Sequence, residues 1–229
     1  MIKMVVFDMA GTTVDENNVV YKTLMLAINE KGINVALDEV LAEGAGKEKL
    51  QAIRSVLAIK QIEDETLAKE IFERFLTMLD DAYAEQDIFE QPNATNVFNA
   101  LRESGIAVVL NTGYNRQTAE ALITKIGWQL DVNFDCLITA SDVELNRPNP
   151  DMILLAMSQL GITDGSEVAK VGDSAIDIEE GQNAGCGLSI GITTGAHTPE
   201  QLRQANPDYI IGDLIELLGI LENANKALV

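Results

Sequence analysis

Five residues with chemically useful side chains follow apolar stretches or rigid turns of this sequence. They are Asp8, Thr112, Arg147, Asp173 and Asp177. Asp8 ends the apolar run from Ile2 to Phe7, which only Lys3 interrupts, and Asp173 follows the run from Val168 to Val171. In an open α/β sheet, ligands bind beyond the carboxyl ends of the strands. We therefore expect these five side chains to meet along one edge of a sheet.

The three aspartates carry like charges that need a counter-ion. Asp177 lies four residues after Asp173, so both carboxylates can face the same cleft from one helical turn. Together with Asp8 they would repel one another and raise their own pKa values unless something neutralised them. Oxygen ligands without histidine or thiolate suit Mg²⁺, which binds through one or two carboxylates plus a substrate phosphate. The pattern therefore predicts a Mg²⁺ site.

The remaining polar groups favour a phosphorylated substrate. Arg147 and Thr112 can donate hydrogen bonds to phosphate oxygens, and the amides of the turn from Asp8 to Gly11 supply further donors. A carboxylate beside Mg²⁺ can attack phosphorus and form an acyl phosphate that water later hydrolyses. Taken singly, each residue also has an ordinary explanation as a helix cap, a turn residue or a surface cation. In combination they indicate phosphoryl transfer.

Alternating strands and helices must position these residues. Beyond the first run, short apolar strands are predicted at 106–110, 134–140, 168–171, 188–192 and 209–211. Helices are predicted between them, at about 95–104, 117–126, 150–160 and 176–184, with a terminal helix from about 214. Strands that alternate with helices at these lengths pair in parallel. The sequence thus predicts an α/β fold with a doubly wound parallel sheet.

Residues 16–86 have a different texture. Apolar residues recur there with a helical period in four segments, which begin near residues 20, 37, 47 and 65, and no strand pattern is present. We interpret this region as an all-helical cap domain that is inserted after the first strand. The core α/β domain would then comprise residues 1–15 and 87–229.

Composition restricts the classes of partner. The 229 residues include 36 acidic and 16 basic ones, and the formal net charge of −20 repels nucleic acid and anionic membrane surfaces. There is no long apolar stretch for a membrane span and no basic leader with a cleavage site, so we expect a cytoplasmic protein with neither nucleic-acid nor membrane partners. The single histidine, His197, disfavours a histidine-rich metal site or a Ser-His-Asp hydrolase. Cys136 and Cys186 are expected to be buried thiols.

Four motifs in order along the chain resemble those of the haloacid dehalogenase (HAD) superfamily of hydrolases, and within it the phosphonatase-like group. The matching segments are Asp8-Met9-Ala10-Gly11-Thr12-Thr13, Leu110-Asn111-Thr112-Gly113-Tyr114, Asn146-Arg147-Pro148 and Val171-Gly172-Asp173-Ser174-Ala175-Ile176-Asp177. The resemblance implies that Asp8 is the nucleophile. It implies metal ligation by Asp8, the Ala10 carbonyl, Asp173 and Asp177. It also implies substrate binding by Gly11, Thr12, Thr112, Gly113, Tyr114 and Arg147.

Ala10 distinguishes the phosphonatase-like group from ordinary phosphatases of the superfamily. Ordinary members have a second aspartate at this position, which serves as general acid and base. The resemblance to the phosphonatases implies instead that a lysine of the cap forms a Schiff base with the aldehyde, so that carbon leaves as an enamine. Lys47, in Gly44-Ala45-Gly46-Lys47, is identified as that lysine. The expected substrate is a small 2-oxoalkylphosphonate such as phosphonoacetaldehyde, and the expected cofactor is Mg²⁺.

Several positions near the expected substrate depart from the phosphonatase pattern. Met9, Asn18, Glu43 and Leu50 stand where that group has tryptophan, cysteine, methionine and histidine. The substrate therefore stays open between a phosphonate and a small phosphate ester such as phosphoglycolate or a sugar phosphate. A non-catalytic phosphate-binding or aspartate-phosphorylated switch protein is a third reading. The family precedent and the apolar helix faces of the insert are consistent with a homodimer.

Overall fold

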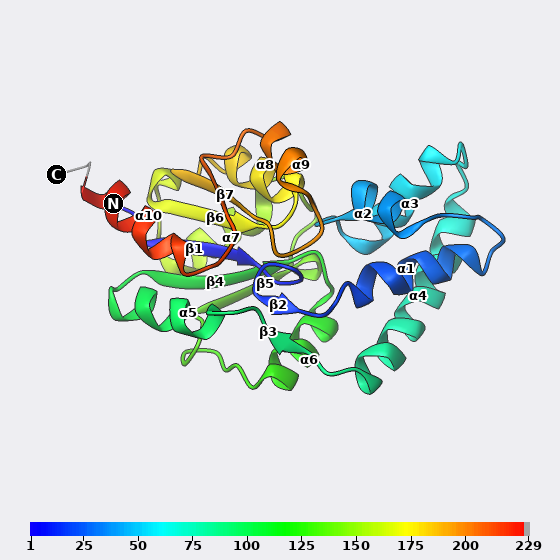
Figure 1. Cartoon of the computed structure of the whole chain (residues 1–229), viewed down its shortest axis with the longest axis horizontal. Coiled ribbons are helices and arrows are strands. Elements are labelled where there is room, and N and C mark those ends of the chain that lie inside the picture. Colours follow the sequence, from blue (N-terminus) through cyan, green and yellow to red (C-terminus); the bar gives the residue numbers. More distant parts are fainter. Residues whose placement is uncertain (227–229) are drawn as a thin grey trace.

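The computed structural model of the chain describes residues 1–226, and its centre is a parallel six-stranded sheet (Figure 1). The strand order is β5-β4-β1-β6-β7-β8. The bounds are β1 Met4–Asp8, β4 Ala107–Thr112, β5 Cys136–Thr139, β6 Val168–Gly172, β7 Leu188–Ile192 and β8 Tyr209–Ile211. The chain runs from β1 outward to β5 and then returns to the other side of β1. The predicted α/β fold with a doubly wound parallel sheet is confirmed.

Helices cover both faces of the sheet, which explains the near-continuous apolar runs of its strands. They are α5 Ala94–Glu103, α6 Arg116–Ile126, α7 Asp151–Leu160, α8 Ala175–Asn183, α9 Pro199–Gln204 and α10 Glu216–Lys226. Successive side chains of a strand point to opposite faces. Along β1, Val5 and Phe7 belong to the core cluster that contains Phe98 of α5, whereas Met4 and Val6 pack with Met152 of α7. The central strand is therefore fully buried and fixed in register.

The register of β1 brings the motif residues together. Asp8, the last residue of β1, is paired with Asn111 of β4, and Phe7 is paired with Val171 of β6. Asp8 therefore lies at the same position along the strand direction as the residues that immediately precede Thr112 and Asp173. The direction of strand order reverses at β1, and such a reversal opens a crevice at the carboxyl ends of the strands.

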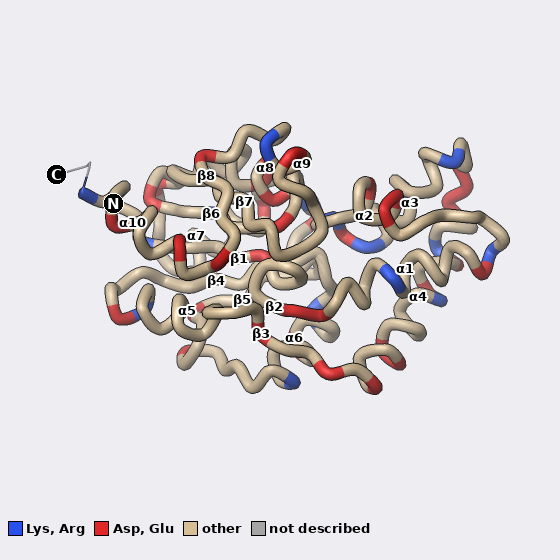
Figure 2. Tube along the Cα trace, in the orientation of Figure 1, with Lys and Arg blue, Asp and Glu red and all other residues tan. Residues whose placement is uncertain are grey.

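Four further helices form a second, laterally placed group (Figure 1). They are α1 Val19–Asn29, α2 Leu37–Gly44, α3 Lys49–Ile59 and α4 Glu65–Glu85, which we call the helical unit. Its interior is apolar and contains Leu24, Ile53, Ile71 and Phe75, all fully buried. Acidic residues are spread over both the α/β part of the chain and the helical unit (Figure 2).

A short antiparallel ribbon lies where the polypeptide enters and leaves the helical unit. It consists of β2 Val14–Asp15 and β3 Phe89–Glu90, with Val14 opposite Glu90. Neither this ribbon nor α9 is predicted from the sequence, because strands of two residues and a helix of six carry too little periodicity. The ribbon places the entry and exit of the helical unit beside each other.

The remaining expectations about the chain as a whole concern thiols and membranes. Cys136 and Cys186 are free thiols, and Cys136 is buried as predicted, whereas Cys186 is only half-buried. Among the residues that the structure describes, no helix combines the length and apolar character needed to span a bilayer.

Candidate functional site

The turn after β1 holds Asp8 at the bottom of a crowded site. Asp8 is buried, and its backbone carbonyl accepts a hydrogen bond from the Thr13 hydroxyl at 2.9 Å. Gly11 has a φ of +81°, and a Cβ there would lie 2.4 Å from Oδ2 of Asp173. Only glycine adopts this conformation freely and also leaves room for the carboxylate. The turn is therefore built to approach Asp173 closely.

The three predicted aspartates do converge. Asp8, Asp173 and Asp177 each place a carboxylate oxygen within 4.8 Å of the others, and all three are buried. Burial, followed by the charge of Asp177, raises the pKa of Asp8. Burial, followed by Asp8 and Asp177, raises the pKa of Asp173 well above its usual value. Three such groups cannot all be ionised at low cost without a nearby cation.

Arg147 supplies positive charge directly to this cluster. Its Nη1 lies 2.7 Å from Oδ1 of Asp8 and 2.9 Å from Oδ1 of Asp177, and its Nε lies 2.9 Å from Oε2 of Glu180. Burial opposes the charge of Arg147, but these carboxylates more than offset it and raise its pKa. For Asp177, burial is likewise outweighed by Arg147 and Lys170, and its pKa is lowered. Arg147 therefore stays charged beside Asp8.

A buried layer under the site holds the arginine, and sequence reasoning missed it. Lys170 is fully buried on β6, with Nζ 3.0 Å from Oδ1 of Asp177 and 3.3 Å from Oε2 of Glu180. The Asn111 side chain accepts a hydrogen bond from Arg147 at 2.6 Å and from Lys170 at 2.7 Å. A lysine inside an apolar strand and a glutamate in the following helix were the available signals. Charged residues are seldom fully buried unless they are paired.

The donor set suits a divalent cation. The clustered groups are all oxygen donors, and the hydroxyl of Thr12, in the turn after Asp8, is buried without a hydrogen-bond partner among the described residues. Ala10 lies in the same turn, and its methyl side chain has no proton to transfer. The three aspartates therefore offer oxygen ligands of the kind that divalent metal ions use.

The loop after β4 lies against the helical unit. The Thr112 hydroxyl accepts a hydrogen bond from the Tyr114 amide at 3.2 Å, and both side chains are buried. A Cβ on Gly113 would lie 2.6 Å from the backbone carbonyl oxygen of Lys47. Nη1 of Arg147 also donates to the Gly46 carbonyl at 3.3 Å. The backbone of the loop that precedes α3 therefore contacts Gly113 and Arg147.

The side chain of Lys47 takes no part in these backbone contacts. Its Nζ donates to the Ser55 hydroxyl at 2.9 Å, and the amine is half-buried. Burial lowers its pKa, and the carboxylates that oppose this effect are Glu43 and Glu179. The structure thus brings the Lys47 backbone to the site and directs its amine along α3.

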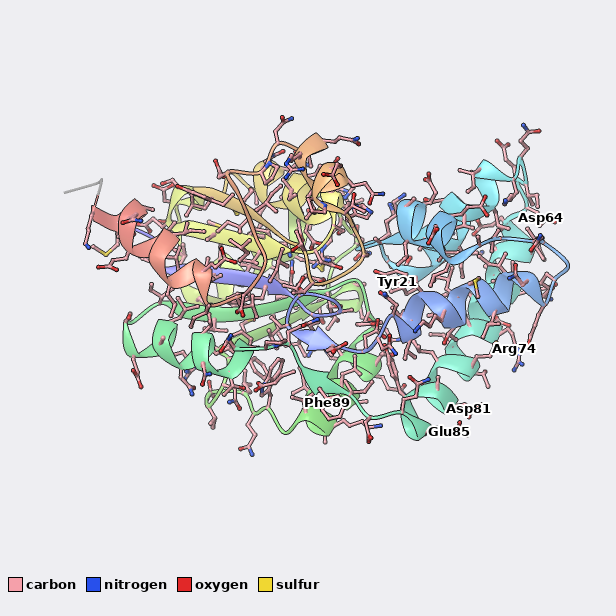
Figure 3. All side chains as sticks on the ribbon, in the orientation of Figure 1. Tyr21, Asp64, Arg74, Asp81, Glu85 and Phe89 are labelled. Atoms are coloured by element: carbon pink, nitrogen blue, oxygen red, sulfur yellow. The ribbon has the colours of Figure 1, made fainter. Side chains whose placement is uncertain are left out.

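A different lysine, Lys49, places its amine at the site. Lys49 is buried, and its Nζ lies 5.4 Å from the ring centre of Tyr21 and 5.1 Å from that of Tyr114. Tyr21 stands at the junction between the helical unit and the sheet (Figure 3). The Nζ donates to the Lys47 carbonyl at 2.8 Å. Burial lowers the pKa of Lys49, and Asp8 is the carboxylate that most opposes this.

Helical spacing was the signal that could have identified Lys49. The helix begins at Lys49, two residues later than predicted, and Glu48 caps it by accepting from the Leu50 and Gln51 amides. Lys49 precedes the buried residues Ala52, Ile53 and Val56 by three, four and seven positions. It therefore shares their apolar face. Lys47 lies before the helix and has no such constraint.

A cleft opens beside the amine. It has a volume of about 480 Å³ and lies between α3 and α4 on one side and the loops after β4 and β5 on the other. Lys49, Gly113 and Tyr114 line it together with Phe72 and Asn146. Pockets of this size accept small organic ligands. The cleft gives a small molecule a route to Lys49.

Comparisons with known proteins agree with this geometry. The sequence model of the haloacid dehalogenase-like hydrolases matches residues 2–185. A phosphonoacetaldehyde hydrolase of Latilactobacillus sakei is 28% identical, and the alignment covers 96% of this chain and 95% of the relative. A phosphoglycolate phosphatase of Salmonella paratyphi A is 29% identical, with 98% and 96% covered. The crystal structure of a phosphonoacetaldehyde hydrolase-like protein from Oleispira antarctica is 25% identical, with a TM-score of 0.86 over 99% of this chain and 94% of that one. The chain therefore belongs to the haloacid dehalogenase-like hydrolases.

Proposed function

We propose that this hydrolase cleaves the carbon–phosphorus bond of a small 2-oxoalkylphosphonate, with Asp8 as nucleophile, Mg²⁺ as cofactor and Lys49 as the Schiff-base lysine. The sequence pointed to Lys47 for the last role. The observation that carries the revised assignment is the buried amine of Lys49, which lies in the electrostatic field of Asp8. The contacts of this amine are the Lys47 carbonyl at 2.8 Å and the faces of the Tyr21 and Tyr114 rings.

The surroundings of Lys49 support a neutral, nucleophilic amine. An ammonium ion loses hydration on burial, which lowers its pKa. A lysine in that state can attack a carbonyl carbon. In the proposed reaction Lys49 adds to the carbonyl of the substrate, and the adduct loses water to give an iminium ion. The positive nitrogen then lies two carbons from phosphorus and can accept the electron pair of the breaking bond.

Asp8 performs the second part of the proposed reaction. One carboxylate oxygen attacks phosphorus in line with the carbon–phosphorus bond, and the electrons of that bond form an enamine on Lys49. The enamine takes a proton on carbon, and water releases the aldehyde and the free amine. A second water hydrolyses the aspartyl phosphate to inorganic phosphate. Departure of carbon as an enamine requires no acid beside Asp8, which agrees with Ala10 at the position of the usual aspartate.

The other site residues have binding roles in this proposal. Arg147, which already donates to Asp8, would also bind the phosphoryl oxygens, together with the Thr112 hydroxyl and the amides of the Asp8 turn. Asp8, Asp173, Asp177 and the Ala10 carbonyl would hold Mg²⁺, which neutralises phosphoryl charge when bound. The helical unit would act as a cap, with boundaries at residues 16 and 86, and would exclude water during the first step.

Borohydride reduction tests the proposal directly. Incubation with phosphonoacetaldehyde, Mg²⁺ and borohydride should yield a stable adduct, and peptide mapping should place it on Lys49. Lys49→Arg should form no adduct and lose phosphonate cleavage. The matched control is Lys47→Arg, which should keep both. An adduct on Lys47, or full turnover by Lys49→Arg, would overturn this assignment.

A phosphomonoesterase is the second candidate. It is favoured by the phosphoglycolate phosphatase relative, which is 29% identical over 98% of this chain, compared with 28% over 96% for the phosphonoacetaldehyde hydrolase. A paired assay of phosphonoacetaldehyde and a panel of phosphate esters, with and without Mg²⁺, distinguishes the two. Ester hydrolysis without phosphonate cleavage would select this alternative.

A further inference from the structure

A buried chain of hydrogen bonds links the entry of the helical unit to the site. Oε2 of Glu16 accepts hydrogen bonds from the Val20 amide at 2.9 Å and from the Tyr83 hydroxyl at 2.8 Å. The Tyr83 and Tyr114 hydroxyls are 2.8 Å apart. Glu16 is 3% exposed, and both tyrosines are also buried. None of the proposed chemical steps uses Glu16 or Tyr83.

The three residues that share these hydrogen bonds come from three different parts of the fold. Glu16 lies between β2 and α1, where the chain enters the helical unit, and Tyr83 lies in the last turns of α4, where it leaves. Tyr114 belongs to the loop after β4, two residues from Thr112. These hydrogen bonds therefore connect both the entry and the exit of the helical unit to the loop after β4, which carries Thr112, a proposed phosphate-binding residue.

The far end of the chain touches the proposed Schiff-base lysine. The Tyr114 ring lies 5.1 Å from Nζ of Lys49, and its edge-on contact with the Tyr83 ring has a centroid distance of 6.5 Å. Because the ring is held at its hydroxyl, its distance from the amine depends on Tyr83 and, through it, on Glu16. An ammonium ion over an aromatic face is stabilised, so ring position affects the charge of the amine.

The charge of Glu16 also affects the protonation of the Lys49 amine. Burial raises the pKa of Glu16 to about 7, although hydrogen bonds from Tyr83 and Val20 and the charges of Lys49 and Lys22 oppose this. The groups that face Glu16 are therefore Lys22 and Tyr21 of α1, Lys49 of α3, Tyr83 of α4 and Tyr114. An ionised Glu16 favours the protonated amine of Lys49.

We propose that Glu16 is a positioning residue for Lys49. Through Tyr83 it holds the Tyr114 ring in place, and its negative charge favours the protonated form of the amine. When Glu16 is protonated the ammonium form loses that support, so at a given pH a larger fraction of the amine is neutral and nucleophilic. This inference rests on the proposed role of Lys49 for its catalytic meaning, but the charge coupling exists without substrate and can be measured alone.

The coupling is tested by NMR titration of the intact protein with ¹³C at the lysine Cε positions. The Lys49 signal is assigned by its loss in Lys49→Arg. Glu16→Gln removes the charge and keeps the size, so the titration midpoint of Lys49 should move to lower pH. Glu16→Asp, which keeps the charge, should return the midpoint toward the wild-type value. An unchanged midpoint in folded Glu16→Gln would overturn the proposal.

Two further variants complete the design. Glu85→Gln removes a carboxylate from the exposed end of α4 (Figure 3) and should leave the Lys49 midpoint unchanged, because solvent screens that charge. Tyr83→Phe removes one hydrogen bond that favours the Glu16 carboxylate and should move the midpoint in the same direction as Glu16→Gln. It replaces Glu16→Gln if that variant does not fold, and no movement in Tyr83→Phe would then refute the proposal.

The catalytic meaning has a separate readout. The rate of borohydride-trapped adduct formation with phosphonoacetaldehyde should shift to lower pH in Glu16→Gln. If the wild-type protein forms no adduct, the proposed function fails, while the Lys49 titration still decides the role of Glu16. If the adduct forms with the same pH profile in both proteins, the positioning role is refuted and the proposed function stands.

Discussion

Replacement of Glu16 by glutamine should change how stability depends on pH. The carboxyl is buried between β2 and α1, and its pKa is raised to about 7 from 4.5. Burial is the largest cause, because a charged carboxylate loses its hydration there. Tyr83 and Val20 donate to the ionised form and recover part of this cost. Glutamine keeps an oxygen for these donors and has no charge to titrate.

The magnitude follows from the shift in pKa. One pKa unit corresponds to about 1.4 kcal/mol, so the rise from 4.5 to about 7 amounts to about 3 kcal/mol. Because the folded-state pKa is the higher one, the folded protein retains a proton that the unfolded chain has released between these values. The stability contributed by Glu16 is therefore fully present below pH 4.5 and is lost as the pH rises through 7.

Urea unfolding of both proteins between pH 4.5 and 8, followed by circular dichroism, measures this effect. The difference in unfolding free energy, Glu16→Gln minus wild type, should rise by about 3 kcal/mol across that range. The exposed-site variant Glu85→Gln should show no comparable slope. Parallel pH curves for wild type and Glu16→Gln would mean that burial does not raise the pKa of Glu16.

Other perturbations address the metal, the arginine and the loop before α3. Asp173→Asn should lose Mg²⁺ binding in isothermal titration calorimetry, and chelation of the wild-type protein should abolish phosphate release until Mg²⁺ returns; turnover that persists in chelator contradicts the proposed cofactor. Arg147→Met removes the buried cation that pairs with Asp8, Asp177 and Glu180, of which only the last two keep Lys170 as a partner, and should lower the unfolding free energy by about 3–5 kcal/mol in urea; an unchanged midpoint would show that the arginine pairs are dispensable. Gly46→Ala places a methyl group 2.3 Å from the Ser174 hydroxyl at a φ of +71°. The loop before α3 must then move, and we expect about a 100-fold lower kcat. A wild-type kcat would show that Gly46 and Ser174 are not in close contact during turnover.

Local pattern was sufficient to predict the fold and the clustering of the three aspartates. The apolar run that ends at Asp8 is buried on both faces, and only a central strand of a covered sheet needs such a run. The four-residue spacing of Asp173 and Asp177 does bring both carboxylates to one point beside Asp8. These predictions held because strand ends in a parallel sheet share an edge, whatever the length of the connections between them.

Tertiary packing alone decided which further residues lie beside the aspartates, and whether burial favours their charged or their neutral form. Lys47 and Lys49 are both lysines near a glycine-rich turn, and the choice between their amines depends on where α3 begins and which of its faces packs inward. The buried layer of Lys170, Glu180 and Asn111 depends on pairing between β1, β4 and β6. Glu16 meets Tyr83 across 67 positions of sequence. Burial and long-range contact set the charge of these groups, and neither quantity is encoded in the spacing of neighbouring residues.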